Sequence, residues 1–288
     1  MKRVIIGLVS LWLAWGCEEE TLLVQGTEIT DFTVKVSSFN IRFDNTGDGV
    51  NQWNNRKENV VSFLKTQDMD IVGMQEVLHS QMEYLQSNLP DYGSVGVGRQ
   101  DGDSLGEYAP IYYKKEHFEL VEGNTFWLSE TPDSPSRGWD AVLERICTYA
   151  KLRDTRNNRI INIFNTHYDH IGSRARLESA KLIMDSVAAQ DETEWVILTG
   201  DLNHTPDDRP YDILTAGNLE DCFFSKSTFG PEGTFNGFNP DGTFNRRIDY
   251  VFAKGFARES YTTYDLIVNG NFLSDHFPVA ALLEYRPL

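Results

Sequence analysis

Side chains that can bind cations or transfer protons recur where short apolar segments of this 288-residue sequence end. Polar residues at strand ends that are far apart in sequence often converge on one site. Five segments carry them: Phe39-Asn40, Gln75-Glu76, Thr166-His167, Gly200-Asp201-Leu202-Asn203 and Ser274-Asp275-His276-Phe277-Pro278. A sixth, Arg247-Ile248-Asp249-Tyr250, is expected inside an apolar strand. Together they predict one catalytic centre.

Taken singly, these residues have ordinary explanations. Asn40 could form a turn, Glu76 could be a solvated loop residue, and Asp201 could cap a helix. Asp249 is harder to explain in this way, because a buried carboxylate without a partner is unfavourable. We expect a protonated His276 as its partner, since a nearby carboxylate raises the pKa of an imidazole.

The residue types fit hydrolysis of a phosphate ester. Carboxylate and amide oxygens are the ligands that Mg²⁺ prefers, and such an ion would neutralise the phosphate. We assign Asn40, Glu76 and Asp275 to a Mg²⁺ site, with Mn²⁺ as the alternative ion. The remaining candidates handle the water and the phosphate: Asp201 orients the water, Asn203, His276 and His167 donate hydrogen bonds, and Asp249 supports His276.

Hydrophobic periodicity predicts the elements that must position these residues. Strands are predicted at 32–43, 70–76, 146–152, 160–166, 195–199, 247–252, 256–265 and 278–285. Helices are predicted at 53–66, 79–89, 172–190 and 210–216. Short strands are expected between 92 and 120, around a loop at 98–106, and residues 225–245 are expected to form a substrate loop. Many strands with few helices indicate two packed sheets flanked by helices.

The first 17 residues have the features of a secretory signal. A basic start precedes an apolar run, Val4 to Trp15, that is too short to span a membrane stably. Ala14-Trp15-Gly16-Cys17 is similar to the cleavage box of bacterial lipoproteins, although Trp15 departs from the usual small residue. We therefore expect a lipid anchor on Cys17 and a place in the cell envelope, with plain secretion as the alternative.

The rest of the chain is expected to be a polar tether, residues 18–31, followed by one monomeric domain, residues 32–288. The net charge of the whole chain is −17 at pH 7. A surface this acidic repels nucleic-acid backbones at long range, although a local basic groove could coexist with it. Cys147 and Cys222 are expected to be buried free thiols, with a disulfide between them as the alternative.

The ordered motif set resembles that of the endonuclease/exonuclease/phosphatase family. The resemblance extends over residues 33 to 285 and implies an α+β fold, a four-layer α/β/β/α sandwich in which two packed mixed sheets lie between helices. It also implies Mg²⁺-dependent phosphoester cleavage. The roles it implies agree with those above: Asn40, Glu76 and Asp275 on the metal side, Asp201 and Asn203 at the water and the phosphate, and Asp249 paired with His276.

Some positions depart from particular branches of that family. Arg42 stands where enzymes similar to exonuclease III have an acidic residue on the metal side, which argues against abasic-site cleavage. The stretch from His167 to His170, followed by Arg174 and Arg176, resembles a secreted and lipoprotein branch found in Bacteroides-type bacteria. We assign His170, Arg174 and Arg176 to substrate binding, with a solvated helix-entry loop as the alternative.

Aromatic residues near the predicted site have two possible roles. Trp127, Trp139, Phe235 and Phe238 could form a wall for a sugar, base or lipid, or they could pack in the core, which the sequence favours. The expected activity is that of a phosphodiesterase or phosphomonoesterase outside the cytoplasm, acting on a phosphorylated small molecule, glycan or lipid headgroup. A nuclease, a sphingomyelinase-like phospholipase and a non-catalytic glycan- or lipid-binding protein are the alternatives. The sequence leaves the substrate open.

Overall fold

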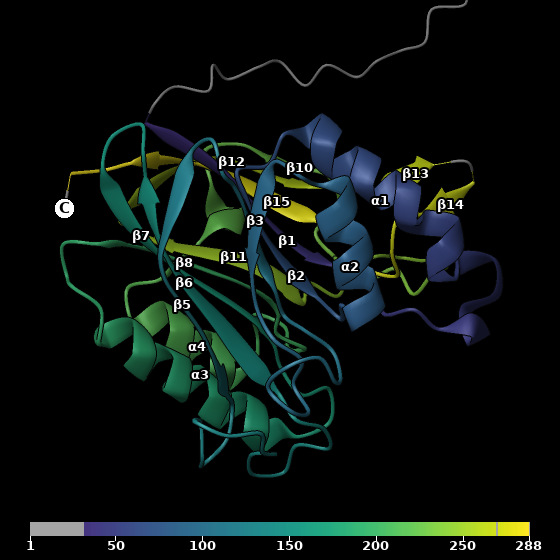
Figure 1. Ribbon diagram of the computed structural model, residues 1–288, viewed down its shortest axis with the longest axis horizontal. Coiled ribbons are helices and arrows are strands. Elements are labelled where there is room, and N and C mark those ends of the chain that lie inside the picture. The colour runs from purple at the N-terminus through teal and green to yellow at the C-terminus, as the bar shows by residue number, and fades with distance from the viewer. Residues whose placement is uncertain (1–31, 269, 288) are drawn as a thin grey trace, which may run out of the picture.

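Two sheets packed face to face form the centre of the molecule. The structure, a computed structural model, describes residues 32–268 and 270–287 (Figure 1). The signal segment, the lipid anchor and the tether predicted from the sequence fall within residues 1–31, outside the described residues. Among the described helices, none is both long enough and apolar enough to cross a membrane.

The first sheet has seven strands in the order β10-β12-β15-β1-β2-β4-β3. In that order their bounds are Thr228–Phe229, Phe256–Thr263, Val279–Tyr285, Thr33–Asn40, Ile71–Gln75, Ile111–Lys114 and Tyr92–Val95. β1 and β2 run parallel, as do β10 and β12, and the other neighbours run antiparallel. The sheet is therefore mixed.

The second sheet has six strands in the order β5-β6-β7-β8-β11-β9. In that order their bounds are Phe118–Trp127, Ile146–Asp154, Arg159–His167, Trp195–Asp201, Asp249–Lys254 and Glu220–Asp221. Only β7 and β8 run parallel, so this sheet is mixed as well. A separate hairpin is formed by β13 (Ile267–Val268) and β14 (Asn271–Phe272).

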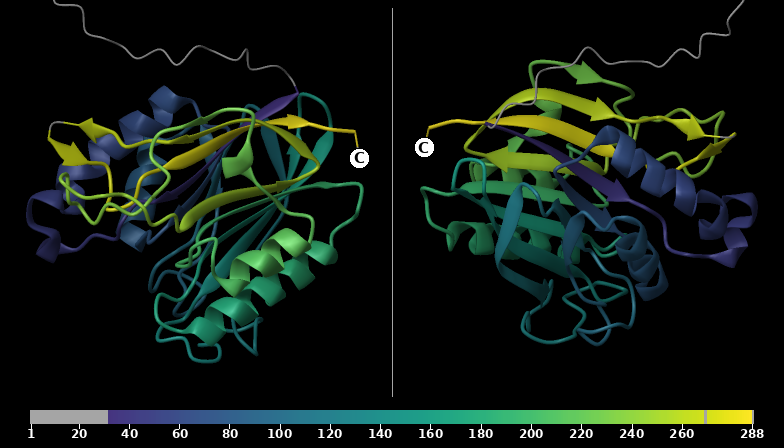
Figure 2. Two further views of the ribbon diagram at one scale, coloured as in Figure 1. Left: turned by 180° about the vertical axis from the view of Figure 1, so that it is seen from behind. Right: turned by 45° about the horizontal axis from the view of Figure 1, so that its top comes forward.

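Helices cover the outer face of each sheet (Figures 1 and 2). On the first sheet lie α1 (Trp53–Gln67) and α2 (His79–Asn88), and on the second lie α3 (Ser173–Ala188) and α4 (Arg209–Ala216). Two short 3₁₀ helices, η1 (Thr46–Asn51) and η2 (Cys222–Phe224), lie in connections. The order helices, sheet, sheet, helices is the predicted four-layer sandwich, and the fold prediction is confirmed.

Alternation along the strands explains how one sequence builds three apolar layers. Successive side chains of a strand point to opposite faces. Ile71 and Ile197 face the core between the sheets, whereas their neighbours Val72 and Leu198 pack against the helices. Cys147 also lies under the helices, buried and unpaired like Cys222, which confirms the prediction of free thiols.

Three details of the elements differ from the prediction. Asp249 is the first residue of β11, at the end of the strand, whereas we expect it within one. β5 continues to Trp127, well past residue 120, with its middle exposed. Four two-residue strands, β9, β10, β13 and β14, are not predicted, because strands of that length are too short to show a period.

Candidate active site

Strand register brings the predicted residues to one edge of the two sheets. β7 and β8 end together, with His167 paired to Asp201. β11 runs antiparallel to β8, so its first residue, Asp249, also pairs with Asp201. In the other sheet, β1 and β2 end together at Asn40 and Gln75. β15 begins beside the end of β1 because these two strands are antiparallel, and the residues just before β15 therefore lie at the same edge.

A cavity of about 380 Å³ lies at this edge. The predicted residues that line it are Glu76, His167, His170, Asp201, Asn203, Asp275 and His276. Asn40 and Asp249 are fully buried behind it and reach the lining residues through hydrogen bonds. The structure thus brings these residues together, while the role assigned to each stays a prediction.

Asp249 and His276 form a buried pair behind the cavity. The Nδ1 atom of His276 lies 2.9 Å from Oδ2 of Asp249, and the hydroxyl of Thr234 donates to the same oxygen at 2.6 Å. Burial alone would lower the pKa of His276, but the carboxylates of Asp249 and Asp201 outweigh it and hold that pKa well above its usual value. The imidazole is therefore protonated near neutral pH, and its Nε2 faces the cavity side of Asp201 at 3.7 Å.

Asp201 lies at the centre of the group. Its Oδ2 accepts a hydrogen bond from Nδ2 of Asn40 at 3.0 Å and lies 3.5 Å from Nε2 of His167. Burial raises the pKa of Asp201 to about 7, against the opposing effect of His276. A carboxylate with that pKa can accept a proton from water at neutral pH, which suits a general base.

His167 is held as a neutral imidazole. Burial lowers its pKa well below the usual value, and the neighbouring charges of Arg145 and Arg99 lower it further. Its Nδ1 lies 3.8 Å from Glu107, a carboxylate that is held by two hydrogen bonds from Arg99 at 2.8 and 2.9 Å. His167 can therefore donate or accept one hydrogen bond toward the cavity, but it is not a strong acid.

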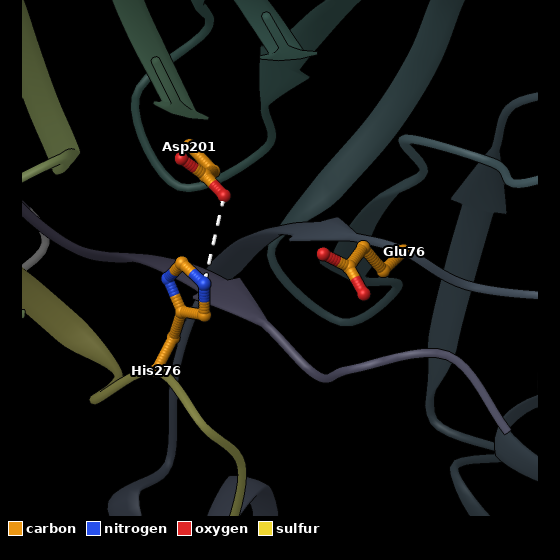
Figure 3. A group of neighbouring side chains, drawn as sticks. All are labelled: Glu76, Asp201 and His276. Atoms are coloured by element: carbon orange, nitrogen blue, oxygen red, sulfur yellow. Dashed lines mark ion pairs between the residues drawn. The ribbon is translucent and has the colours of Figure 1, made fainter. Parts of the chain in front are cut away.

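The side of the cavity near Glu76 offers oxygen ligands for a cation. Ligand atoms of Glu76, Asp201 and His276 all lie within 4.8 Å of one another (Figure 3). Because His276 is protonated, it is a poor ligand, and hard oxygen donors are what Mg²⁺ or Mn²⁺ would use. Glu76 and Asp275 supply such donors on the same side of the cavity, so the residues present fit a divalent cation there.

Asn40, which we predict on the metal side, is hydrogen-bonded at both ends of its amide. Its Nδ2 donates to both Glu76 and Asp201, each at 3.0 Å, and its Oδ1 accepts the backbone N–H of Arg42. In this arrangement the amide holds two carboxylates in place. Its oxygen accepts one hydrogen bond and keeps a second lone pair for a cation.

Three residues around the cavity have a left-handed backbone conformation, which residues other than glycine rarely adopt. The φ angles of Arg42, Glu76 and Asn203 are 58°, 58° and 49°. Such conformations cost about 1–3 kcal/mol each and cluster at functional sites. Asn203 is also fixed by a hydrogen bond from its Nδ2 to the carbonyl of Tyr168 at 3.0 Å, which leaves its second amide N–H for another acceptor.

Two of the predicted substrate-binding residues lie elsewhere. Arg174 and Arg176 are in the first turn of α3 and line a separate hollow with Asp208 and Pro210. Arg176 donates to the carbonyl of Asp169 at 2.9 Å, which ties the helix to the preceding loop. The structure does not bring these two arginines to the cavity around Asp201, because the backbone turns into α3 before they are reached.

The arginine that does reach the cavity beside His170 is Arg145, which sequence reasoning missed. It is buried, its Nη2 lies 2.9 Å from Nδ1 of His170, and its Nε lies 3.3 Å from Asp169. Its Nη1 has no hydrogen-bond partner among the described residues. A signal was present, since Arg145 directly precedes β6 and the β6–β7 hairpin pairs Cys147 with Thr166 at the same edge.

The four residues of the candidate aromatic wall do not form one surface. Trp127 is buried and donates from its indole to the carbonyl of Arg99. Trp139 and Phe238 do not line the cavity, whereas Phe235 does, with its ring 5.1 Å from that of His276. Of the candidate wall, Phe235 is therefore the ring that a substrate in the cavity could contact, beside the side chain of Arg246, and Phe43 lines the same cavity.

Comparison with known proteins agrees with this geometry. The family model described as "Endonuclease/Exonuclease/phosphatase family" matches residues 37–276. A structure of an endonuclease/exonuclease/phosphatase from Bacteroides vulgatus is 38% identical, with a TM-score of 0.85, and the match covers 88% of this chain and 99% of that one. A mannosyl-6-phosphatase from Bacteroides thetaiotaomicron is 36% identical, with a TM-score of 0.82, over 88% of this chain and 100% of that one.

A relative outside the bacteria also matches most of this chain. Protein L388 of Acanthamoeba polyphaga mimivirus is 27% identical over 255 residues, which are 82% of this chain and 93% of the viral protein. The family model alone extends over most of the domain, from β1 to His276. Its members depend on divalent metals and hydrolyse phosphoesters, so this chain is a hydrolase. The chain belongs to the endonuclease/exonuclease/phosphatase family.

Proposed function

We propose that this protein is a Mg²⁺-dependent phosphomonoesterase that removes phosphate from a sugar or glycan. One observation carries the proposal: a single cavity joins a buried His276–Asp249 pair, a carboxylate with a pKa of about 7, and oxygen ligands for a cation. These are the groups that water attack on a phosphate ester requires.

The residues divide the chemistry between them. Asp201 takes a proton from water as the water oxygen bonds to phosphorus, and the bond from phosphorus to the sugar oxygen breaks. The sugar oxygen then takes up a proton from solvent. His276, as an imidazolium, donates to a phosphoryl oxygen and offsets the charge that develops there, while neutral His167 adds a second hydrogen bond. A divalent ion on the side of Glu76 and Asp275 would supply further positive charge to the phosphate.

Three features favour a sugar phosphate over a nucleic acid. The mannosyl-6-phosphatase from Bacteroides thetaiotaomicron is similar over almost the whole described chain. The cavity is of a size suited to one small ligand, with Phe235 on its wall as a surface on which an apolar sugar face can pack. The strongly acidic chain also disfavours a long polyanion.

The test is phosphate release from mannose 6-phosphate and other sugar phosphates by the purified protein with Mg²⁺. We expect EDTA to abolish release, added Mg²⁺ to restore it, and Asp201→Asn to lower kcat by about 10²–10⁴-fold. Asp191→Asn, at an exposed position, is the matched control and should behave as the unchanged protein. Faster cleavage of bis-(p-nitrophenyl) phosphate than of every monoester would instead indicate a phosphodiesterase.

We also propose that the enzyme lies outside the cytoplasm and is held at a membrane by a lipid attached to Cys17. The support is the sequence of residues 1–17, with its basic start, apolar run and Gly16-Cys17 pair. Expressed in a Gram-negative host, the full chain should fractionate with membranes and Cys17→Ser should not. Equal recovery of both forms in the soluble fraction would contradict the anchor.

A further inference from the structure

The guanidinium of Arg42 lies among the carboxylates on the cation side of the cavity. Its Nη1 is 3.8 Å from Oε2 of Glu76, and its Nε is 3.8 Å from Oδ2 of Asp275. Both carboxylates are the oxygen donors that fit a divalent ion, so a positive charge of the protein's own already stands between them. Of the residues that line the cavity, Arg42 is the cation placed at this wall.

Arg42 is held in that place from two directions. Asp48, in the η1 turn, accepts from Nε at 2.9 Å and from Nη2 at 3.0 Å, a two-pronged ion pair that fixes the plane of the guanidinium. The backbone of Arg42 donates to Asn40 and accepts from the Gln81 amide at 3.1 Å. Its left-handed φ of 58° is therefore imposed by several contacts.

This placement limits the number of divalent ions that the wall can hold. Sites with two ions place them about 3.5–4 Å apart and need several carboxylates to offset the charge. Here the guanidinium of Arg42 lies 3.8 Å from a carboxylate oxygen of both Glu76 and Asp275, so it occupies space beside the oxygens that a second ion would need. A second divalent ion in the same position would meet a like charge and would find its ligands already partly neutralised.

We propose that Arg42 acts as a built-in cation that restricts the active site to one divalent ion. The inference rests on the proposed metal-dependent function and refines it. Arg42 takes the part of a second ion by sharing the charge of Glu76 and Asp275, and its Nη1 is positioned to contact a phosphoryl oxygen once the substrate is bound.

The experiment counts Mn²⁺ ions in the purified protein, by isothermal titration calorimetry and by electron paramagnetic resonance. The unchanged protein should bind one Mn²⁺ with the spectrum of an isolated ion. Arg42→Glu, which removes the cation and adds a ligand, should bind two ions with a spin-coupled spectrum. Arg42→Gln removes only the charge, serves as a milder variant if Arg42→Glu misfolds, and should admit a second ion at higher Mn²⁺ concentration.

Arg246→Gln is the matched control, because Arg246 lines the same cavity away from Glu76 and should leave the count at one. Two coupled ions in the unchanged protein would overturn the inference and leave the metal dependence intact. One ion in both Arg42 variants, with a raised KM for substrate, would also overturn it, since Arg42 would then act on the phosphate alone. No Mn²⁺ binding in the unchanged protein would contradict the proposed metal dependence and the inference together.

Discussion

Two hydrogen-bonded aspartate–histidine pairs, each with a buried aspartate, are present among the described residues at different places in the sheets. Asp249 and His276 lie 2.9 Å apart at the cavity, and Asp70 and His117 lie 2.8 Å apart beside the start of β2. Both aspartates are almost completely buried, at 0% and 1% exposure. The two pairs are alike in residue type, in distance and in the burial of the aspartate, although the side chain of His117 is 23% exposed and that of His276 only 5%.

The partners of each aspartate distinguish them. Asp70 also accepts from the backbone N–H of Lys35 at 2.9 Å, and Lys114 lies 3.4 Å away, so both of its oxygens have partners. Asp249 has one oxygen, Oδ1, without any hydrogen-bond partner among the described residues. Its histidine also faces a second carboxylate, that of Asp201.

This difference separates a structural pair from the pair to which we assign a role in catalysis. In the Asp70 pair both carboxylate oxygens have partners, and the pair links β2 to its neighbours. In the Asp249 pair one carboxylate oxygen has no partner among the described residues, and the charged ring of His276 faces the cavity. Buried polar groups are normally satisfied, so an exception near a cavity indicates function. Matched substitutions in the two pairs therefore test whether their roles differ.

The largest difference should appear in catalysis. Asp249→Asn removes the charge that keeps His276 protonated, and we expect kcat/KM for a sugar phosphate to fall by about 10²–10⁴-fold. Asp70→Asn should leave kcat/KM unchanged, since that pair lies outside the lining of the cavity. Steady-state kinetics of the two purified variants provide the measurement. Equal losses would mean that the pairs differ less than their hydrogen bonds suggest.

A smaller, graded difference should appear in the pH dependence of kcat/KM. Activity should rise as pH increases through about 7, because Asp201 must lose its proton to accept one from water. It should fall again at higher pH, as His276 loses the proton that its neighbouring carboxylates retain well above its usual pKa. The result is a bell-shaped profile.

Substitutions sharpen that profile. His117→Gln should leave both limbs in place, whereas a residual-activity profile of Asp249→Asn should show the alkaline limb moved to lower pH. Saturating Mg²⁺ should move the acidic limb to lower pH, because a nearby cation favours the ionised form of Asp201. A flat profile from about pH 5 to 9 would rule out Asp201 and His276 as the titrating groups.

The smallest difference should appear in stability, and in the opposite direction. Asp70→Asn breaks a satisfied network and should lower the free energy of unfolding by about 1–3 kcal/mol. Asp249→Asn should lower it less, since the folded state already carries an oxygen without a partner. Urea unfolding followed by circular dichroism at pH 7 measures both. A larger loss in Asp249→Asn would assign that pair a structural role.

The sequence alone determined the layers of the fold and most of the site. A short continuous apolar run such as 195–198 favours a strand buried on both faces, and the polar residue that ends it is then expected at a sheet edge. That local reasoning predicted the strand ends at Glu76, His167 and Asp201. The sequence also predicted the partner of Asp249, because an unpaired buried carboxylate is so unfavourable.

Only the tertiary structure decided which basic residues face the cavity. Arg174 and Arg176 are close to His170 in sequence, yet the turn into α3 directs them to another hollow. Arg145 is 25 residues from His170 and contacts it, because the β6–β7 hairpin brings the two together. Arg42 was noted for its charge, but its place between Glu76 and Asp275 depends on three separate loops.

The physical reason is the range of the interactions concerned. Hydrophobic period and strand ends are set by near neighbours in the chain, so they can be read from sequence. The direction of a side chain at the site is set by contacts between segments far apart in sequence. Examples are the hydrogen bonds from Asn40 to Asp201 and from Arg56 to the carbonyl of Leu273. Most residues of the site could therefore be predicted from the sequence, whereas their relative orientation depends on how the two sheets pack.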